Sequence, residues 1–324
     1  MYFPYLRGRQ NELLCLRELL DAGCLPEDVM PVIEPVRFNS TFFLTIKRFI
    51  EKKRSIMVIK NSEVGKYESD YNDWLESIVQ EKDVIKKEKK TKTLAEYEEL
   101  LNSPYIVNAL IVNDTNKNDI YFGELETEKI VLINRDIANY TDLYLEAKEE
   151  IVAKYTFIPP DEDFKDEISG AAVLLYDCYN KAKRNIDYLD SPDEFFSKYH
   201  LVYKKRGYEG FSDYSIVGDE YEESGFAPLA IAIHIVYFDE KNFLRVHHFV
   251  SDSNENISDP ARKFEEAMHK LVNWDKLSMV KKTVGLRALI SCYENQKFPG
   301  LGVVKKYSLM HHIELMGSYL GEKR

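Results

Sequence analysis

The stretch YFPYLRGRQNELLCLRELL at residues 2–20, together with VMPVIEPV at residues 29–36, decides the fold class of this chain. Residues 2–6 form a short apolar run. Residues 11–20 then carry leucines at spacings of three and four, the pattern of an amphipathic helix. The second apolar run follows at residues 29–36. A strand, a helix and a second strand in this order predict a β/α unit, in which a helix covers two parallel strands.

The same alternation continues along the chain. Apolar runs that we interpret as strands lie at residues 2–6, 29–36, 55–59, 107–112, 130–133, 155–158, 171–176 and 228–238. Helical patterns separate most of them, including those at residues 38–50, 67–79, 94–101 and 138–151. Eight runs that are apolar on both faces predict an α/β fold, a TIM-like (β/α)8 barrel. The alternative is a doubly wound open sheet, but no run is followed by the Gly-x-Gly-x-x-Gly loop that such sheets often carry.

The predicted barrel is irregular. Residues 187–225 form a long insertion before the eighth run, and insertions of this size usually build lids or binding loops. Residues 243–250 can pair with the eighth run as a hairpin, and helices are predicted over residues 260–274 and 307–319. We therefore expect one domain, with a barrel core at residues 1–240 and a hairpin and C-terminal helical extension at residues 241–324 packed on it.

Composition narrows the class of protein. The chain has 55 acidic and 44 basic residues and a formal net charge of -11, which argues against indiscriminate binding to duplex nucleic acid but leaves room for a local basic pocket. The four cysteines are far apart and form no zinc-binding pattern, so we expect reduced thiols. No apolar run approaches about 18 residues, the length of a membrane span. We expect a cytoplasmic protein without a membrane partner, and the sequence identifies no cofactor.

Polar residues directly after the apolar runs are the candidates for a ligand site, because the C-terminal ends of barrel strands meet at one mouth. Those expected to bind a ligand are Arg7, Arg37, Lys60, Asn61, Asn134 and Arg135. Several cations at one mouth favour an anionic ligand, and arginine offers forked donors to phosphate or carboxylate. The structural alternative is that Arg7, Glu34, Arg37 and Asp136 pair with one another and only close the barrel end.

Three further residues are candidates for acid–base chemistry. Glu34 lies between apolar neighbours, as either the partner of a nearby cation or a site acid with a shifted pKa. Asp177 ends the seventh run, where a carboxylate can act on a ligand or cap the next segment. His234 alternates with isoleucines, as a buried core imidazole also would. The adjacent histidines at 247–248 and 311–312 point to different faces and predict no metal site.

Aromatic residues are concentrated in the long insertion. The segment RGYEGFSDYSIVGDEYEESG at residues 206–225 contains Tyr208, Phe211 and Tyr214. Such side chains can stack against a planar ligand or a nucleic-acid base. The alternative is that they hold a long loop against the body of the protein.

The N-terminal stretch resembles the beta-protein family, which is named after a bacteriophage protein and consists mostly of uncharacterised bacterial proteins. The family pattern is matched by Tyr2, Pro4, Leu6, Arg7, Glu12, Leu16 and residues 31–34. GFSDYSIV at residues 210–217 resembles the Gly-x-x-Asp-Tyr segment of the same family. In the N-terminal pattern, Cys15 stands where the family usually has a small residue. The resemblance implies a barrel-like fold and a setting in conflict between phages and bacteria, beside a nuclease-like protein. It adds weight to Arg7, Glu12, Glu34 and Asp213 without supplying a mechanism.

These observations favour a binding module of an anti-phage defence system, which holds a phosphate-bearing ligand such as a nucleotide or a nucleic-acid end at the barrel mouth and acts with a second protein. One alternative is a metal-assisted phosphodiester hydrolase that uses Glu34, Asp177 or Asp213 with His234 as acid and base. Another is a non-catalytic structural partner of a nuclease subunit. Metal dependence separates the first two hypotheses, since scattered carboxylates would need a cation for hydrolysis.

Overall fold

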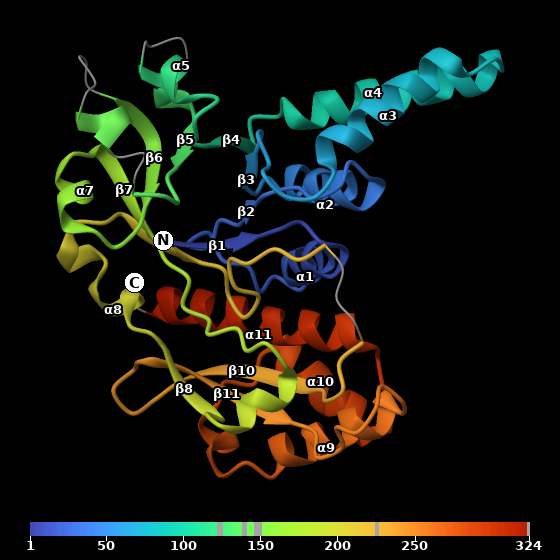
Figure 1. The fold of residues 1–324 in the computed structure, drawn as a ribbon, viewed down its shortest axis with the longest axis vertical. Helices are drawn as coiled ribbons and strands as arrows, with labels where there is room; N and C mark the ends of the chain where they lie inside the picture. The colour runs from blue at the N-terminus through green and yellow to red at the C-terminus, as the bar shows by residue number, and fades with distance from the viewer. Residues whose placement is uncertain (122–125, 138–140, 146–150, 224–226, 323–324) are drawn as a thin grey trace.

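Eight parallel strands close into a barrel in the computed structural model, which describes residues 1–324 apart from 122–125, 138–140, 146–150, 224–226 and 323–324 (Figure 1). Around the barrel the strands follow the order β1 (Tyr2–Leu6), β2 (Val32–Ile33), β3 (Ile56–Ile59), β4 (Ile106–Ile111), β5 (Val131–Ile133), β6 (Val152–Ile158), β7 (Ser169–Leu175) and β9 (Gly210–Asp213). β9 pairs with β7 on one side and with β1 on the other, which closes the barrel. The predicted TIM-like α/β barrel is confirmed.

The helices between these strands are long in the first half of the barrel and short in the second. β1 is followed by α1 (Gln10–Asp21), β2 by α2 (Ser40–Glu51), and β3 by α3 (Tyr67–Gln80) and α4 (Val84–Leu101). Later connections hold only α5 (Lys117–Tyr121), η1 (Thr127–Lys129), η2 (Thr141–Leu145) and α7 (Glu162–Asp166). The helix predicted over residues 138–151 lies mostly outside the described residues, and η2 is the part of it that is described. None of the described helices combines the length and apolar character needed to cross a bilayer.

Side chains along the barrel strands alternate between the barrel interior and the surrounding helices, as the two-residue period of a strand requires. In β1, Phe3 and Tyr5 belong to the interior cluster, whereas Tyr2 and Leu6 pack with the helices outside. The interior cluster continues around the barrel through Val32, Met57, Ile59, Ala109, Ile111, Val131, Ile133, Phe157 and Val173. The same period makes residues 7, 34, 61 and 135 the next inward positions beyond the C-terminal ends of their strands.

The prediction for the eighth strand was wrong. Residues 228–238 do not enter the barrel: β10 (Ala232–Phe238) pairs antiparallel with β11 (Leu244–Val250), and β11 pairs with β8 (Asp193–Ser197). The eighth barrel strand is β9, which lies inside the predicted insertion. It is only four residues long, GFSD, and its glycine and aspartate are poor strand formers, so its sequence resembles a loop. The predicted hairpin between residues 228–238 and 243–250 is confirmed.

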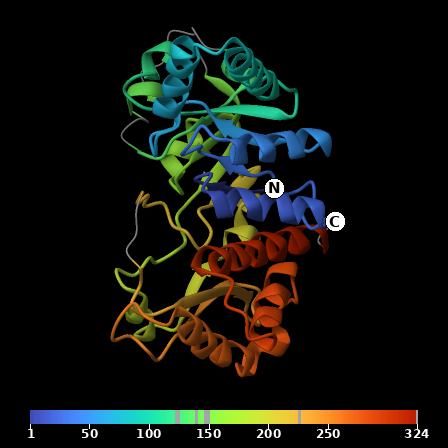
Figure 2. The same cartoon turned by 90° about the vertical axis from the view of Figure 1, so that its right-hand side faces the viewer.

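A long C-terminal helix lies between the barrel and this three-stranded sheet. The chain after β11 forms α9 (Pro260–Val272), η5 (Asp275–Met279), α10 (Val284–Glu294) and α11 (Leu301–Glu322). In Figures 1 and 2, α11 runs between α1 on the barrel side and β10 on the sheet side. Most of its residues between Val304 and Gly317 are buried. The remaining short elements, η3 (Asn185–Leu189), α8 (Tyr199–Val202) and η4 (Lys204–Arg206), lie on the path between β7 and β9.

Barrel closure provides the first prediction. A Cβ atom at Gly210 would press against the buried ring of Phe3 and lie 2.9 Å from the carbonyl oxygen of Met1, and neither group is free to move. We expect Gly210→Ala to lower the free energy of unfolding by about 1–3 kcal/mol, the usual cost of overpacking. Urea denaturation followed by circular dichroism measures the change. Gly321→Ala is the matched control, because no atom lies within 4 Å of its Cβ position and alanine favours a helix. Equal stability of the two variants would contradict close packing around Gly210, where β9 meets β1.

Candidate functional site

A buried ion pair occupies the mouth of the barrel. Arg7 follows β1 at an inward position, and its guanidinium donates to the carboxylate of Glu34, which follows β2. The second terminal nitrogen of Arg7 donates to the carbonyl oxygen of Asp219. The guanidinium carbon lies 5.1 Å from the centre of the Tyr5 ring and 5.2 Å from that of Tyr214. Both charged side chains are almost completely buried, so the pair is part of the barrel core.

Glu34 accepts hydrogen bonds from several groups besides Arg7. Its Oε2 accepts a 2.8 Å bond from the Tyr5 hydroxyl, and its Oε1 accepts a 2.9 Å bond from the backbone N–H of Glu63. Arg135, which follows β5, lies 3.7 Å from Glu34 and also pairs with the Glu63 carboxylate. Two guanidinium groups and two carboxylates therefore balance one another. The structural alternative for Arg7 and Glu34, a clasp across the barrel end, describes this geometry.

Two of the predicted residues fix the rim of the mouth. The side-chain amide of Asn61 accepts from the N–H of Ile111 at 2.9 Å and donates to the carbonyl of the same residue at 2.8 Å, which extends the pairing of β3 with β4. Asp177 accepts from the N–H of Asp219 at 2.9 Å and from that of Tyr179 at 3.0 Å. Burial is the main reason that the pKa of Asp177 rises to about 6. Asp177 thus anchors, at the mouth, the same loop that Arg7 binds.

The other predicted residues do not converge on the mouth. Arg37 forms a two-pronged ion pair with Asp70 of α3, with bonds of 2.6 and 3.2 Å, and Lys60 is exposed. Asn134 is buried behind the barrel wall, where its amide donates to the Tyr144 hydroxyl at 3.1 Å. The strand period explains the difference, since residues 60 and 134 precede the inward positions 61 and 135. Counting every second residue from the inward side chains of each strand would have separated positions 61 and 135, which face the mouth, from positions 60 and 134, which do not.

Asp213 lies on the outer face of β9 instead of in the mouth. Its Oδ1 accepts 2.8 Å bonds from the Tyr2 hydroxyl and from the backbone N–H of Ser215. The Ser215 hydroxyl in turn bonds to Nδ1 of His312 on α11 at 2.6 Å. Burial raises the pKa of Asp213 to about 6. The carboxylate therefore belongs to the layer that joins the barrel to α11.

His234 lies in β10, outside the barrel, within a chain of hydrogen bonds. Its Nε2 is 3.1 Å from the Tyr179 hydroxyl, which is 2.6 Å from the Tyr188 hydroxyl. Its Nδ1 is 2.7 Å from Nδ1 of His248. Burial lowers the pKa of His234 well below the ordinary value, and His248 and Lys305 lower it further, so the ring is neutral at pH 7. The hydrogen-bond partners of His234 are thus Tyr179 and His248, and not Glu34, Asp177 or Asp213.

The chain beyond the C-terminal ends of β7 and β9 forms the wall of a pocket of about 710 Å³, which we call the seam pocket. It is bounded by Tyr179 to Tyr188, by Ile216 and Val217, by the start of β10 and by α11. Its charged lining residues are Lys181, Lys183, Arg184, Lys305 and Glu222. Arg184 pairs with Asp187 at 2.6 Å, and Lys181 lies 3.6 Å from Glu220 and from Glu222, whereas Lys183 and Lys305 form no ion pair with a described residue. The excess of cations in the lining therefore comes mainly from these two lysines.

Two residues of α11 give the seam pocket its chemical character. Lys305 is reached by solvent, yet the surrounding protein lowers its pKa, and the charges of Arg9 and Lys181 lower it further against the opposite effect of Glu12. Ser308 is buried, and its hydroxyl has no hydrogen-bond partner among the described residues. Neither residue carries a recognisable sequence signal, because both lie in a helix whose neighbours are mostly apolar.

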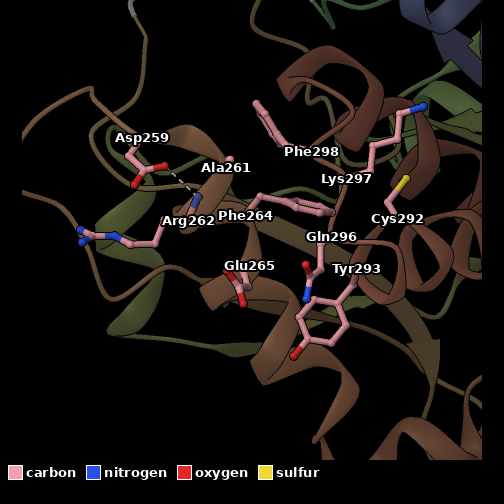
Figure 3. Close-up of a pocket in the computed structure, with 10 residues that line it drawn as sticks. All are labelled: Asp259, Ala261, Arg262, Phe264, Glu265, Cys292, Tyr293, Gln296, Lys297 and Phe298. Atoms are coloured by element: carbon pink, nitrogen blue, oxygen red, sulfur yellow. Dashed lines mark hydrogen bonds between the residues drawn. The ribbon is translucent and has the colours of Figure 1, made fainter.

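A second hollow of about 440 Å³ lies away from the strand ends, between α9 and α10 (Figure 3). The ring centres of Phe264 and Phe298 lie 5.6 Å apart along its wall. Asp259 caps α9 by accepting a 3.1 Å hydrogen bond from the backbone N–H of Arg262. None of the predicted site residues lines it. Within the described part of the chain, no group of three or more His, Cys, Asp and Glu side chains is arranged to hold a metal ion.

Comparisons of the chain with protein-family models, with curated proteins and with solved structures gave no match.

The clasp at the mouth leads to a stability prediction. We expect Arg7→Met to lower the free energy of unfolding by about 3–5 kcal/mol, because it leaves the Glu34 carboxylate buried without its main partner. The double variant Arg7→Met with Glu34→Gln should recover part of this loss, since no buried charge remains. Arg9→Met is the control, because its guanidinium is more exposed, donates to the carbonyl of Glu222 and lies over the Tyr221 ring without a buried carboxylate as its partner. Chemical denaturation at pH 7 measures all three, and a loss below about 1 kcal/mol for Arg7→Met would contradict the clasp.

Asp213 leads to a prediction about pH. Its pKa is about 6 in the folded chain against 3.8 for the free side chain, so the folded state binds the proton more tightly. The contribution of this group to stability is therefore complete below pH 3.8 and is lost as the pH rises through 6. We expect Asp213→Asn, which keeps the accepting oxygen, to show a smaller loss of stability between pH 4.5 and pH 8 than the wild type.

Denaturant titrations at both pH values measure this difference, and any constant cost of the substitution cancels between them. Asp190→Asn, at an exposed position, should keep the wild-type dependence on pH. An identical pH dependence for Asp213→Asn and the wild type would rule out a protonated Asp213.

Proposed function

We propose that this protein is a binding module for a phosphate-bearing anion, such as a nucleotide or the end of a nucleic-acid strand. The ligand occupies the seam pocket, on the C-terminal side of the barrel strands. This position lies beside the mouth and not within it, because Arg7 and Arg135 are already engaged by Glu34 and Glu63. An anion entering the mouth would have to displace a buried carboxylate from a guanidinium, which is costly.

The positive charge of the seam pocket is the observation that carries the proposal. Lys181, Lys183, Arg184 and Lys305 line it in a chain whose formal net charge is -11. Arg184 pairs with Asp187 at 2.6 Å and Lys181 with Glu220 and Glu222 at 3.6 Å each, but Arg184 and both glutamates are largely exposed and such pairs are weak. A concave site with a locally positive field concentrates anions even on an acidic protein.

The lowered pKa of Lys305 supports the same ligand class. The surrounding protein is the main cause of the lowered pKa, the charges of Arg9 and Lys181 add to it by repulsion, and that of Glu12 opposes it. A phosphate group would supply the counter-charge and would relieve this repulsion. The hydroxyl of Ser308, which has no partner among the described residues, lies on the same helix one turn away and can donate to a phosphate oxygen.

The seam pocket also has aromatic lining residues that suit a planar group. Tyr179, Tyr188 and His234 line it with rings whose orientation is fixed by their mutual hydrogen bonds. Aromatic rings held in this way can stack against a base. The combination of cations and aromatic rings in one pocket favours a nucleotide over a simple inorganic anion.

The geometry favours the two alternative functions less. Glu34, Asp177 and Asp213, the carboxylates of the hydrolase hypothesis, have separate hydrogen-bond partners and make no contact with one another. A structural role beside a nuclease subunit would not require an electropositive pocket. A setting in phage defence and a second, nuclease-like protein follow from the family resemblance alone, and they remain part of the proposal on that basis.

Equilibrium binding tests the proposal. We expect AMP to bind more tightly than adenosine or inorganic phosphate, since only AMP carries both groups. Lys305→Gln should weaken AMP binding about tenfold or more, the effect of losing a hydrogen bond to a charged group, and should leave adenosine unaffected. Lys47→Gln, an exposed position on α2, is the matched charge control.

A 5′-phosphorylated dinucleotide and its unphosphorylated form extend the same titration to nucleic-acid ends. Binding of neither AMP nor the phosphorylated dinucleotide, or equal loss of AMP binding in Lys305→Gln and Lys47→Gln, would overturn the assignment of the seam pocket.

A further inference from the structure

The helices α3 and α4 form an arm that projects from the barrel (Figures 1 and 2). At its base, the ring of Tyr97 stacks on Phe43 of α2 at 3.8 Å, and Trp74 lies 6.2 Å from Phe38. Its far end has no such contacts. Val79, Val84 and Ile85, where the two helices meet, are 75%, 68% and 79% exposed.

The two helices of the arm carry opposite charges toward its far end, whereas the base of α4 is acidic, with Glu96, Glu98 and Glu99. α3 contains four acidic residues, Glu68, Asp70, Asp73 and Glu76, and no lysine or arginine. The first ten residues of α4 contain five lysines, Lys86, Lys87, Lys89, Lys90 and Lys92, against one acid, Glu88. Only one of these lysines forms an ion pair with a described residue, namely Lys90 with Glu81 at 3.3 Å. The run at residues 81–92, predicted as a solvated helix end or connector, thus forms the exposed start of α4.

Only the outer end of the arm is weakly stabilised by its own chain. Nearer the base, Tyr71, Trp74 and Tyr97 are partly buried against the core, although no residue of α3 and only Leu94 of α4 is fully buried. A helix end without a covered apolar face depends on local charge pairs or on contact with another molecule. Three large apolar side chains at one exposed end also favour coverage by a partner.

We propose that the arm is the interface of a homodimer, in which α3 of each copy lies against α4 of the other. A two-fold axis along the arms places the outer half of each α3, with Asp73 and Glu76, opposite the basic start of α4 of the other copy, and it brings the two apolar tips together. Symmetric interfaces require this self-complementarity, because each residue contact occurs twice. A nucleic-acid occupant fits less well, since its phosphates would approach the carboxylates of α3 as closely as the lysines of α4.

The test uses the full chain in sedimentation velocity at 1–100 µM, a range of about two decades. The wild type should be a dimer at the upper concentrations in low salt, with an affinity that falls in 0.5 M salt, about the range where surface charges are screened. Reversal of α4 charge in Lys86→Glu/Lys87→Glu/Lys89→Glu should weaken self-association about tenfold or more. Reversal of α3 charge in Glu68→Lys/Asp73→Lys/Glu76→Lys should do the same.

Mixing the two reversed variants is the decisive measurement. One then has two acidic helices in its arm and the other two basic helices, so the mixture should form a heterodimer although neither variant self-associates. Lys47→Glu/Lys52→Glu, at exposed positions in α2 and directly after it, is the control and should remain dimeric. Circular dichroism verifies that each variant is folded.

Three results would overturn the proposal. The first is a wild type that is monomeric at every concentration, and the second is a mixture of folded variants that stays monomeric. The third is binding of a 20-base-pair duplex that depends on the lysines of α4 while self-association does not, which would assign the arm to nucleic acid.

Discussion

The ion pair between Arg7 and Glu34 determines how the barrel ends. Burying two charges costs several kcal/mol for each ion, and only good geometry with additional hydrogen bonds offsets this cost. Here Glu34 accepts from Tyr5 and from the backbone of Glu63 as well as from Arg7. The pair joins the ends of β1 and β2, and the contact of Arg7 with Tyr214 extends the connection to β9, which closes the barrel. The loop after β9 is held through the same guanidinium by the carbonyl of Asp219.

The position of α11 follows from the closed barrel. Its buried surface contacts α1 on one side and β10 on the other, so it joins two separate clusters of apolar residues. Buried histidines serve this packing: His312 bonds to Ser215 beside the barrel, and His311 lies 2.7 Å from the carbonyl of Val236 in the sheet. Burial lowers the pKa of His311 to about 4 and that of His312 to about 3, so both are neutral at pH 7 and cost little to bury.

The sequence predicts the parallel barrel because long-range strand order follows from a local pattern, an apolar run followed by an amphipathic helix. It fails for β9, where four residues are too few to show a period. It also fails for β10, whose isoleucines pack against α9 and α10 as well as they would in a barrel. The mouth was partly predictable. Positions 7, 34, 61 and 135 follow the inward parity of their strands, whereas 60 and 134 do not. Lys305 and Ser308 could not be found, because their role depends on where α11 lies against segments more than 100 residues earlier.

Charge balance separates the two candidate ligand positions in a way that residue types alone do not. Arginine following a barrel strand suggests an anion site, but at this mouth each guanidinium has its own carboxylate, and the field outside is close to neutral. The lysines of the seam pocket come from loops and from a helix, and a single lining carboxylate opposes them. Arg184 and Lys181 pair with carboxylates at the surface, but such exposed pairs are weak. Cations that the fold neutralises only weakly are a better indication of a ligand site than a buried arginine. Charge balance therefore favours a stabilising role for the clasp, and it is the reason why we place the proposed ligand in the seam pocket.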